Sequence, residues 1–229
     1  MIDVVCLDMA GTTVLDGGLV ADAFSAALSE LEVDDEQERR QMERYVAETM
    51  GTSKIEVFRA LFPDEATAQR ANSAFEAAYG RLVDLGGVAP VPGAVEAIAA
   101  LRAGGRRVAL LTGFSPATRD RLIAALGWEQ IADLTLAPAE VGRGRPAPDL
   151  VLTAALRLRA ERVSSVAVAG DTAADIESGL RAGAGVVAGV LTGSDDAERL
   201  RRAGASHVLG SVAELPGLLE RLDAAGAAP

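Results

Sequence analysis

The sequence predicts an α/β protein in which helices cover both faces of a parallel sheet and an all-helical insertion follows the first strand. From residue 94 onward, short apolar runs of β-forming residues alternate with helical segments, which is the pattern of right-handed βαβ units. Residues 19–85, in contrast, show only the helical spacing of apolar side chains. The chain therefore combines one α/β domain with one helical domain.

The α/β elements follow one another at regular intervals. The apolar run Val4–Leu7 is typical of a strand buried on both faces, and it ends at Asp8. Further strands are expected at 108–111, 134–136, 166–169, 186–191 and 207–209. Helices are expected at 94–103, 116–126, 148–159, 172–182 and 195–203, with a last helix after residue 209.

The insertion contains four predicted helices. The first includes Phe24 and Leu28, the second continues through Tyr45, and the fourth runs from Asp64 towards Leu82. The third follows Ser53, which forms a predicted capping box with Glu56. Residues 88–93 contain two prolines and are expected to form a rigid, polyproline-like linker. We therefore predict a core domain of residues 1–16 and 88–229 and a helical cap domain of residues 17–87.

Composition restricts the partners. The formal net charge of −11 opposes binding to nucleic acid and to anionic membranes, so a small anionic substrate needs a local positive site. The single cysteine, Cys6, lies in the first strand, which argues against a disulfide framework or a zinc cluster. The sequence shows no signal peptide or spanning segment, and we expect a cytoplasmic protein.

Polar side chains follow several of the predicted strands where those strands end. Asp8 ends the first, Thr112-Gly113 follows the second, and Asp171 follows a later one, with Asp175 one helical turn further on. The loop 142–148 adds two arginines at 143 and 145. These strand ends meet in one crevice of a parallel sheet. Carboxylates there suit Mg²⁺, and a threonine, backbone N–H groups and one arginine can hold a phosphoryl dianion that a carboxylate attacks.

This pattern resembles the haloacid dehalogenase (HAD) superfamily of hydrolases, and within it the phosphonoacetaldehyde hydrolase (phosphonatase) branch. The resemblance rests on Asp8-Met9-Ala10-Gly11-Thr12, on Thr112, on Arg145 in Gly-Arg-Pro-Ala-Pro, and on Gly170-Asp171-Thr172-Ala173-Ala174-Asp175. It implies a Rossmann-like core with a mobile helical cap. The residue roles it implies are the nucleophile Asp8, the Mg²⁺ ligands Asp8, Ala10 (carbonyl) and Asp171 with Asp175 in support, and the phosphate-binding residues Met9, Ala10, Thr112, Gly113 and Arg145.

Two residues separate the phosphonatase branch from ordinary HAD phosphatases. Ala10 stands where phosphatases carry a second, acid–base aspartate. The segment Met50-Gly51-Thr52-Ser53-Lys54-Ile55 resembles the cap segment that supplies an imine-forming lysine. Lys54 is the only lysine among 22 basic residues, and the first position of a helix favours its free amine over the ammonium. The preferred substrate is therefore phosphonoacetaldehyde or a related small phosphonate.

Alternatives remain open at the sequence level. Val57 and Gly18 differ from the phosphonatase pattern, which leaves a small-molecule phosphatase as the second enzyme class. Arg143 competes with Arg145 for the phosphate. A non-catalytic relic that binds a ligand or a partner is the alternative outside enzymes. The residues leave the oligomeric state open, whereas the resemblance implies a homodimer formed through the cap.

Overall fold

Strand β1 (Val4–Asp8) lies inside the sheet, and its side chains alternate between two hydrophobic clusters. Val5 and Leu7 pack into one cluster, whereas Val4 and Cys6 pack into the other. This computed structural model describes residues 1–15 and 17–226, so the domain limits predicted at residues 16 and 229 lie outside the described residues. Burial raises the pKa of the Cys6 thiol to about 12, as expected for a core cysteine and not for a nucleophile.

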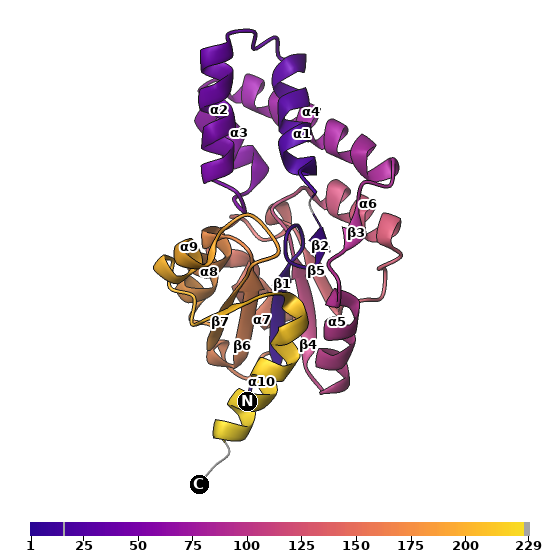
Figure 1. The fold of residues 1–229 in the computed structure, drawn as a ribbon, viewed down its shortest axis with the longest axis vertical. Helices are drawn as coiled ribbons and strands as arrows, with labels where there is room; N and C mark the ends of the chain where they lie inside the picture. Colours follow the sequence, from indigo (N-terminus) through magenta and orange to yellow (C-terminus); the bar gives the residue numbers. More distant parts are fainter. Residues whose placement is uncertain (16, 227–229) are drawn as a thin grey trace.

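The described strands confirm the predicted α/β fold. Six parallel strands have the order β5-β4-β1-β6-β7-β8 (Figure 1). Cys6 of β1 lies opposite Ala109 on one side and Val168 on the other. The other strands are β4 (Arg107–Leu111), β5 (Leu134–Leu136), β6 (Val166–Gly170), β7 (Val186–Val190) and β8 (His207–Leu209).

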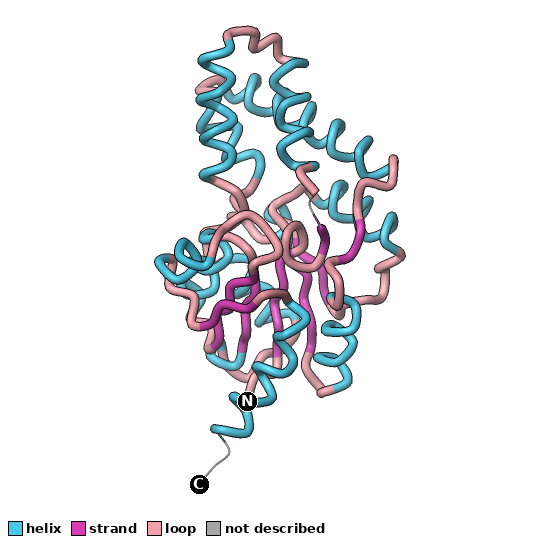
Figure 2. Tube along the Cα trace, in the orientation of Figure 1, coloured by secondary structure: helices cyan, strands magenta, loops and turns pink. Residues whose placement is uncertain are grey.

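Helices cover both faces of this sheet, as Figure 2 shows. Helices α5 (Ala94–Ala103) and α10 (Leu215–Gly226) pack against the face that carries Val5 and Leu7. The opposite face is covered by α7, α8 and α9. The remaining elements of the core are α6 (Pro116–Leu126), α7 (Asp149–Arg157), α8 (Ala173–Ala182), α9 (Ala197–Arg202), η1 (Pro138–Glu140), η2 (Val163–Ser165) and η3 (Val212–Glu214).

Residues 19–84 form four helices that lie beyond the carboxyl end of β1 (Figure 1). They are α1 (Leu19–Glu30), α2 (Glu36–Glu48), α3 (Lys54–Leu61) and α4 (Glu65–Asp84). An aromatic cluster joins three of them, because the Phe24 ring stacks on Phe58 at 4.5 Å and Phe75 lies 5.5 Å from Phe24. Within the described chain we find no helix that combines the length and apolar composition needed to span a bilayer.

The linkers on either side of these helices pair with each other. Strand β2 (Val14–Leu15) is antiparallel to β3 (Ala89–Pro90), and the Val91 N–H donates to the Thr13 carbonyl at 2.9 Å. The prediction of a rigid, polyproline-like linker was wrong for residues 89–90, which form a short strand. Proline lacks an N–H donor, so it suits a two-residue edge ribbon but gives no sequence signal for one.

Candidate active site

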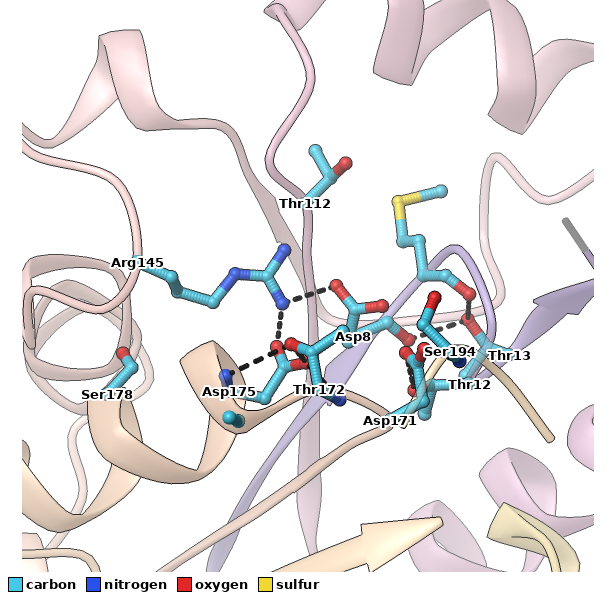
Figure 3. A network of polar contacts seen from close by, with 12 residues as sticks. Asp8, Thr12, Thr13, Thr112, Arg145, Asp171, Thr172, Asp175, Ser178 and Ser194 are labelled. Carbon is cyan, nitrogen blue, oxygen red and sulfur yellow. Dashed lines mark hydrogen bonds and ion pairs between the residues drawn. The ribbon is translucent and has the colours of Figure 1, made fainter. Parts of the chain in front are cut away.

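Arg145 connects two carboxylates at the carboxyl end of the sheet. Its Nη1 donates to Asp8 Oδ1 at 2.5 Å and also to Asp175 Oδ1 (Figure 3). The Arg145 side chain is only 4% exposed, and both carboxylates are buried. Arg143 instead points into solvent, with 71% of its side chain exposed, and pairs with Asp149. Of the two arginines in this loop, Arg145 therefore lies next to the predicted nucleophile.

Asp171 lies on the other side of Asp8. Its Oδ1 accepts from the Thr12 hydroxyl at 3.0 Å, and its Oδ2 accepts from the Ser194 N–H at 2.8 Å (Figure 3). Burial, followed by the nearby Asp8 charge, raises the pKa of Asp171 to about 7. The carboxylate is thus held in position by two donors, while its negative charge is disfavoured.

The donor set fits a divalent cation. Carboxylate oxygens of Asp8, Asp171 and Asp175 all lie within 4.8 Å of one another, and all three side chains are buried. Among the described residues, Arg145 and Lys54 are the basic side chains that line the cavity into which these carboxylates open. These two basic side chains are fewer than the three carboxylates of the cluster, so the negative charge of the cluster is not fully neutralised. An all-oxygen set with this charge suits Mg²⁺, and Ala10 lines the same cavity.

We predict that cation affinity rises with pH through the neutral range. The predicted ligand Asp171 would bind a cation as its carboxylate, and its raised pKa of about 7 means that protons compete with the cation below that pH. The Mg²⁺ association constant should fall roughly tenfold per pH unit below about 7 and level off above about 8. Calorimetric titration between pH 5.5 and 8.5 measures this, and a flat profile would contradict the assignment of Asp171 as a ligand.

The carboxylates open into a narrow cavity of about 30 Å³. Residues from both parts of the chain line it, including the predicted site residues Asp8, Ala10, Lys54, Thr112, Gly113, Arg145 and Asp171. The space directly beside Asp8 is therefore narrow in this arrangement. A larger groove of about 690 Å³ adjoins it and shares Thr52, Lys54, Gly113, Phe114 and Arg145 as lining residues.

Lys54 reaches the cavity from the first position of α3. Its side chain is buried, and Nζ lies 5.7 Å from the centre of the Phe114 ring. The predicted capping box at this helix start was wrong, because the Ser53 side chain makes no capping hydrogen bond. Ser53 is buried against the loop that contains Gly144, and its Cβ lies only 2.6 Å from the position that a Cβ on residue 144 would take. Glu56, the other residue of the predicted box, instead forms an ion pair with Arg59 at 2.7 Å.

Two predicted site residues do not line the cavity. The Met9 side chain is fully buried, and its carbonyl accepts N–H groups from Thr12, Thr13 and Val14. Asp175 lies behind Arg145 and also caps its own helix, because Oδ2 accepts from the Thr172 N–H at 3.1 Å and from the Thr172 hydroxyl at 2.5 Å. Asp175 does not line the cavity, but it binds Arg145, and a carboxylate oxygen of Asp175 lies within 4.8 Å of oxygens of Asp8 and Asp171.

Two residues that hold Asp171 were not predicted from the sequence. Thr12 belongs to the first motif and lies shortly after Asp8, the last residue of β1, but no role was predicted for it. Ser194 follows the end of β7, so the same strand-end rule predicts it. The approach of residues 50–52 to the core was also unpredicted. Gly51 has φ of +83°, and a side chain there would collide with Thr172.

Comparison with known proteins agrees with this arrangement. The sequence model for haloacid dehalogenase-like hydrolases matches residues 2–183. The chain belongs to the haloacid dehalogenase-like hydrolase family. It is an enzyme of that family, with phosphonatase-like neighbours.

The similar proteins of this HAD-like hydrolase include phosphonatases. A phosphonoacetaldehyde hydrolase from Parabacteroides distasonis is 31% identical over 160 residues, but the match spans only 58% of this chain and 60% of that protein. One from Bordetella pertussis is 30% identical, covering 79% of this chain and 80% of that protein. The crystal structure of a phosphonoacetaldehyde hydrolase-like protein from Oleispira antarctica superposes with a TM-score of 0.82 at 28% identity, covering 100% of this chain and 96% of that one.

Proposed function

We propose that this HAD-like hydrolase cleaves the C–P bond of phosphonoacetaldehyde or a related small phosphonate, with Asp8 as nucleophile and Lys54 as the imine-forming amine. One observation carries the proposal. The only lysine of the chain is buried at the first position of α3 and borders the same cavity as Asp8, Thr112 and Arg145. Imine chemistry requires a primary amine, which an arginine does not supply.

The residues support the following sequence of bond changes. The Lys54 amine condenses with the substrate aldehyde, releases water and forms a protonated imine. A carboxylate oxygen of Asp8 attacks phosphorus, the C–P bond breaks, and its electron pair moves towards the imine nitrogen to give an enamine. The enamine takes a proton on carbon and is hydrolysed to acetaldehyde and free Lys54. Water hydrolyses the aspartyl-phosphate to phosphate and Asp8.

The surrounding groups match the charge that develops. Arg145 has N–H donors beyond those used by Asp8 and Asp175, and Thr112 and Gly113 lie on the same cavity wall. Mg²⁺ bound by Asp8, Asp171 and the Ala10 carbonyl, with Asp175 in support, would supply charge neutralisation at the phosphoryl oxygens. Because electrons flow into the imine, the leaving carbon needs no acid at position 10, where this chain has alanine.

The helical part completes the proposal. The cavity beside Asp8 is narrow and Lys54 of the helical part lines it, so we expect residues 17–87 to open and close over the core as a cap. Dimerisation through this cap stays a prediction from the family resemblance.

Borohydride trapping tests the proposal. Protein incubated with phosphonoacetaldehyde and Mg²⁺ is reduced, digested and mapped by mass spectrometry. We expect the reduced adduct on the peptide that contains Lys54, and none on the corresponding peptide of Lys54→Arg. Absence of an adduct, together with Mg²⁺-dependent phosphate release from sugar or alcohol esters, would support a small-molecule phosphatase instead.

A further inference from the structure

We propose that Glu76 is a positioning residue: its carboxylate holds α4 against the start of α6 and thereby keeps Lys54 beside Asp8. The catalytic importance of this position of Lys54 rests on the proposed function. The contacts of Glu76 themselves do not depend on any substrate. Glu76 lies in the middle of a helix, far in sequence from every motif of the site.

Glu76 is bonded across the boundary between the helical part and the core. Its Oε1 accepts from the Ser115 N–H at 3.2 Å, and its Oε2 accepts from the Ser115 hydroxyl at 2.7 Å and from the Thr118 hydroxyl. Ser115 is the N-cap of α6, and its hydroxyl also accepts from the Thr118 N–H at 3.2 Å. A carboxylate at a helix N-terminus gains from the helix dipole as well as from the hydrogen bonds.

The segment that Glu76 holds is part of the site. Ser115 directly follows Thr112, Gly113 and Phe114, all of which line the cavity. The Phe114 ring packs on Tyr79 of α4 at 4.5 Å and lies 5.7 Å from Lys54 Nζ. The Lys54 backbone N–H donates to the Gly113 carbonyl at 3.3 Å. Glu76 and Phe114 thus fasten α4 to the loop against which Lys54 lies.

Rigid packing transmits the position of α4 to Lys54. Helix α3, which begins at Lys54, packs on α4 through Phe58 and Phe75, whose ring centres are 5.9 Å apart. A displacement of α4 away from α6 therefore moves α3 with it. The cavity beside Asp8 is narrow in this arrangement, so we expect these contacts to break and re-form as the helical part opens and closes over the core.

A second contact between the same helices provides a matched control. Asp84, at the end of α4, pairs with Arg121 of α6 at 3.5 Å, and both side chains are about half exposed. An exposed pair of this kind adds little to stability. Glu76, in contrast, is partly buried and accepts several hydrogen bonds. Removal of Asp84 should therefore leave the closed arrangement intact.

The single lysine makes the test direct. Amine acetylation followed by mass spectrometry reports the exposure of Lys54, and the α-amino group of Met1, whose side chain is 85% exposed, serves as the internal reference. Relative to that reference, we expect Glu76→Ala to speed Lys54 acetylation roughly tenfold or more, because labelling follows the open population. Glu76→Gln, which keeps an acceptor oxygen, should show a smaller increase, and Asp84→Ala should stay within about twofold of the parent protein.

Two outcomes would overturn the inference. One is an unchanged acetylation rate in Glu76→Ala, even if its thermal stability falls, because Glu76 would then only cap α6. The other is an equal rise of the Lys54 acetylation rate in Glu76→Ala and Asp84→Ala, which would mean that any change between α4 and α6 opens the helical part. Ser115→Ala, which removes one donor on the core side, repeats the test if Glu76→Ala does not fold. Since acetylation needs no substrate, a positive result stands even if borohydride trapping refutes the imine.

Discussion

Asp8→Asn is expected to abolish hydrolysis without unfolding the protein. The amide oxygen cannot displace a leaving group at phosphorus as the carboxylate does, and loss of a nucleophile typically lowers kcat by about 10⁴-fold or more. The substitution also removes a negative charge beside Asp171, while Arg145 keeps its contact with Asp175. In the absence of metal we therefore expect thermal stability equal to or above that of the parent protein.

Phosphate release measures the predicted loss of hydrolysis, and calorimetry measures the predicted thermal stability. Asp175→Asn is the informative companion variant, because Asp175 contacts the same guanidinium but does not line the cavity. It should lower activity less than Asp8→Asn does. An Asp8→Asn variant that retains more than about a tenth of the activity would exclude covalent catalysis through residue 8.

Lys54→Arg is expected to eliminate C–P cleavage while preserving positive charge in the cavity. A guanidinium does not form an imine, so the substrate loses its electron acceptor as the bond breaks. We expect turnover of phosphonoacetaldehyde to fall by roughly 10³-fold or more, on the scale of losing one catalytic group in other hydrolases. Acetaldehyde formation measures the loss directly.

The comparison with a phosphate ester separates the two enzyme classes. If the chain also hydrolyses esters slowly, that rate should be nearly unchanged in Lys54→Arg, because the Asp8 and metal contacts do not involve the amine. Equal losses for phosphonate and ester would mean that Lys54 serves only as a cation. Full retention of C–P cleavage would remove the imine from the mechanism.

Much of this architecture was predictable because it depends on patterns that are short in sequence. The alternation of buried strands and helices gave the sheet and placed Asp8, Thr112 and Asp171 at strand ends. Parallel strands bring such ends together whatever their separation in the chain. Ser194, which follows β7, lies at the same edge of the sheet and could have been predicted in the same way.

The remaining features depend on contacts that leave no local pattern. The β2–β3 ribbon contains two residues on each side, too few to show a period. Ser53 and Glu56 have the residue types of a capping box, yet tertiary packing directs Ser53 to the Gly144 loop. Nothing in the sequence around Glu76 indicates its hydrogen bond to Ser115, because that contact exists only when α4 packs against α6. Tertiary contacts, not propensity, decide each of these cases.

The central claim is that the phosphoryl group passes through Asp8. Enzyme quenched in acid during turnover of phosphonoacetaldehyde, then digested and mapped, tests it most directly. We predict a phosphoryl group on the peptide that contains Asp8 and none in Asp8→Asn. A phosphorylated peptide from another part of the chain, or rapid turnover with no phosphoenzyme at any quench time, would contradict it.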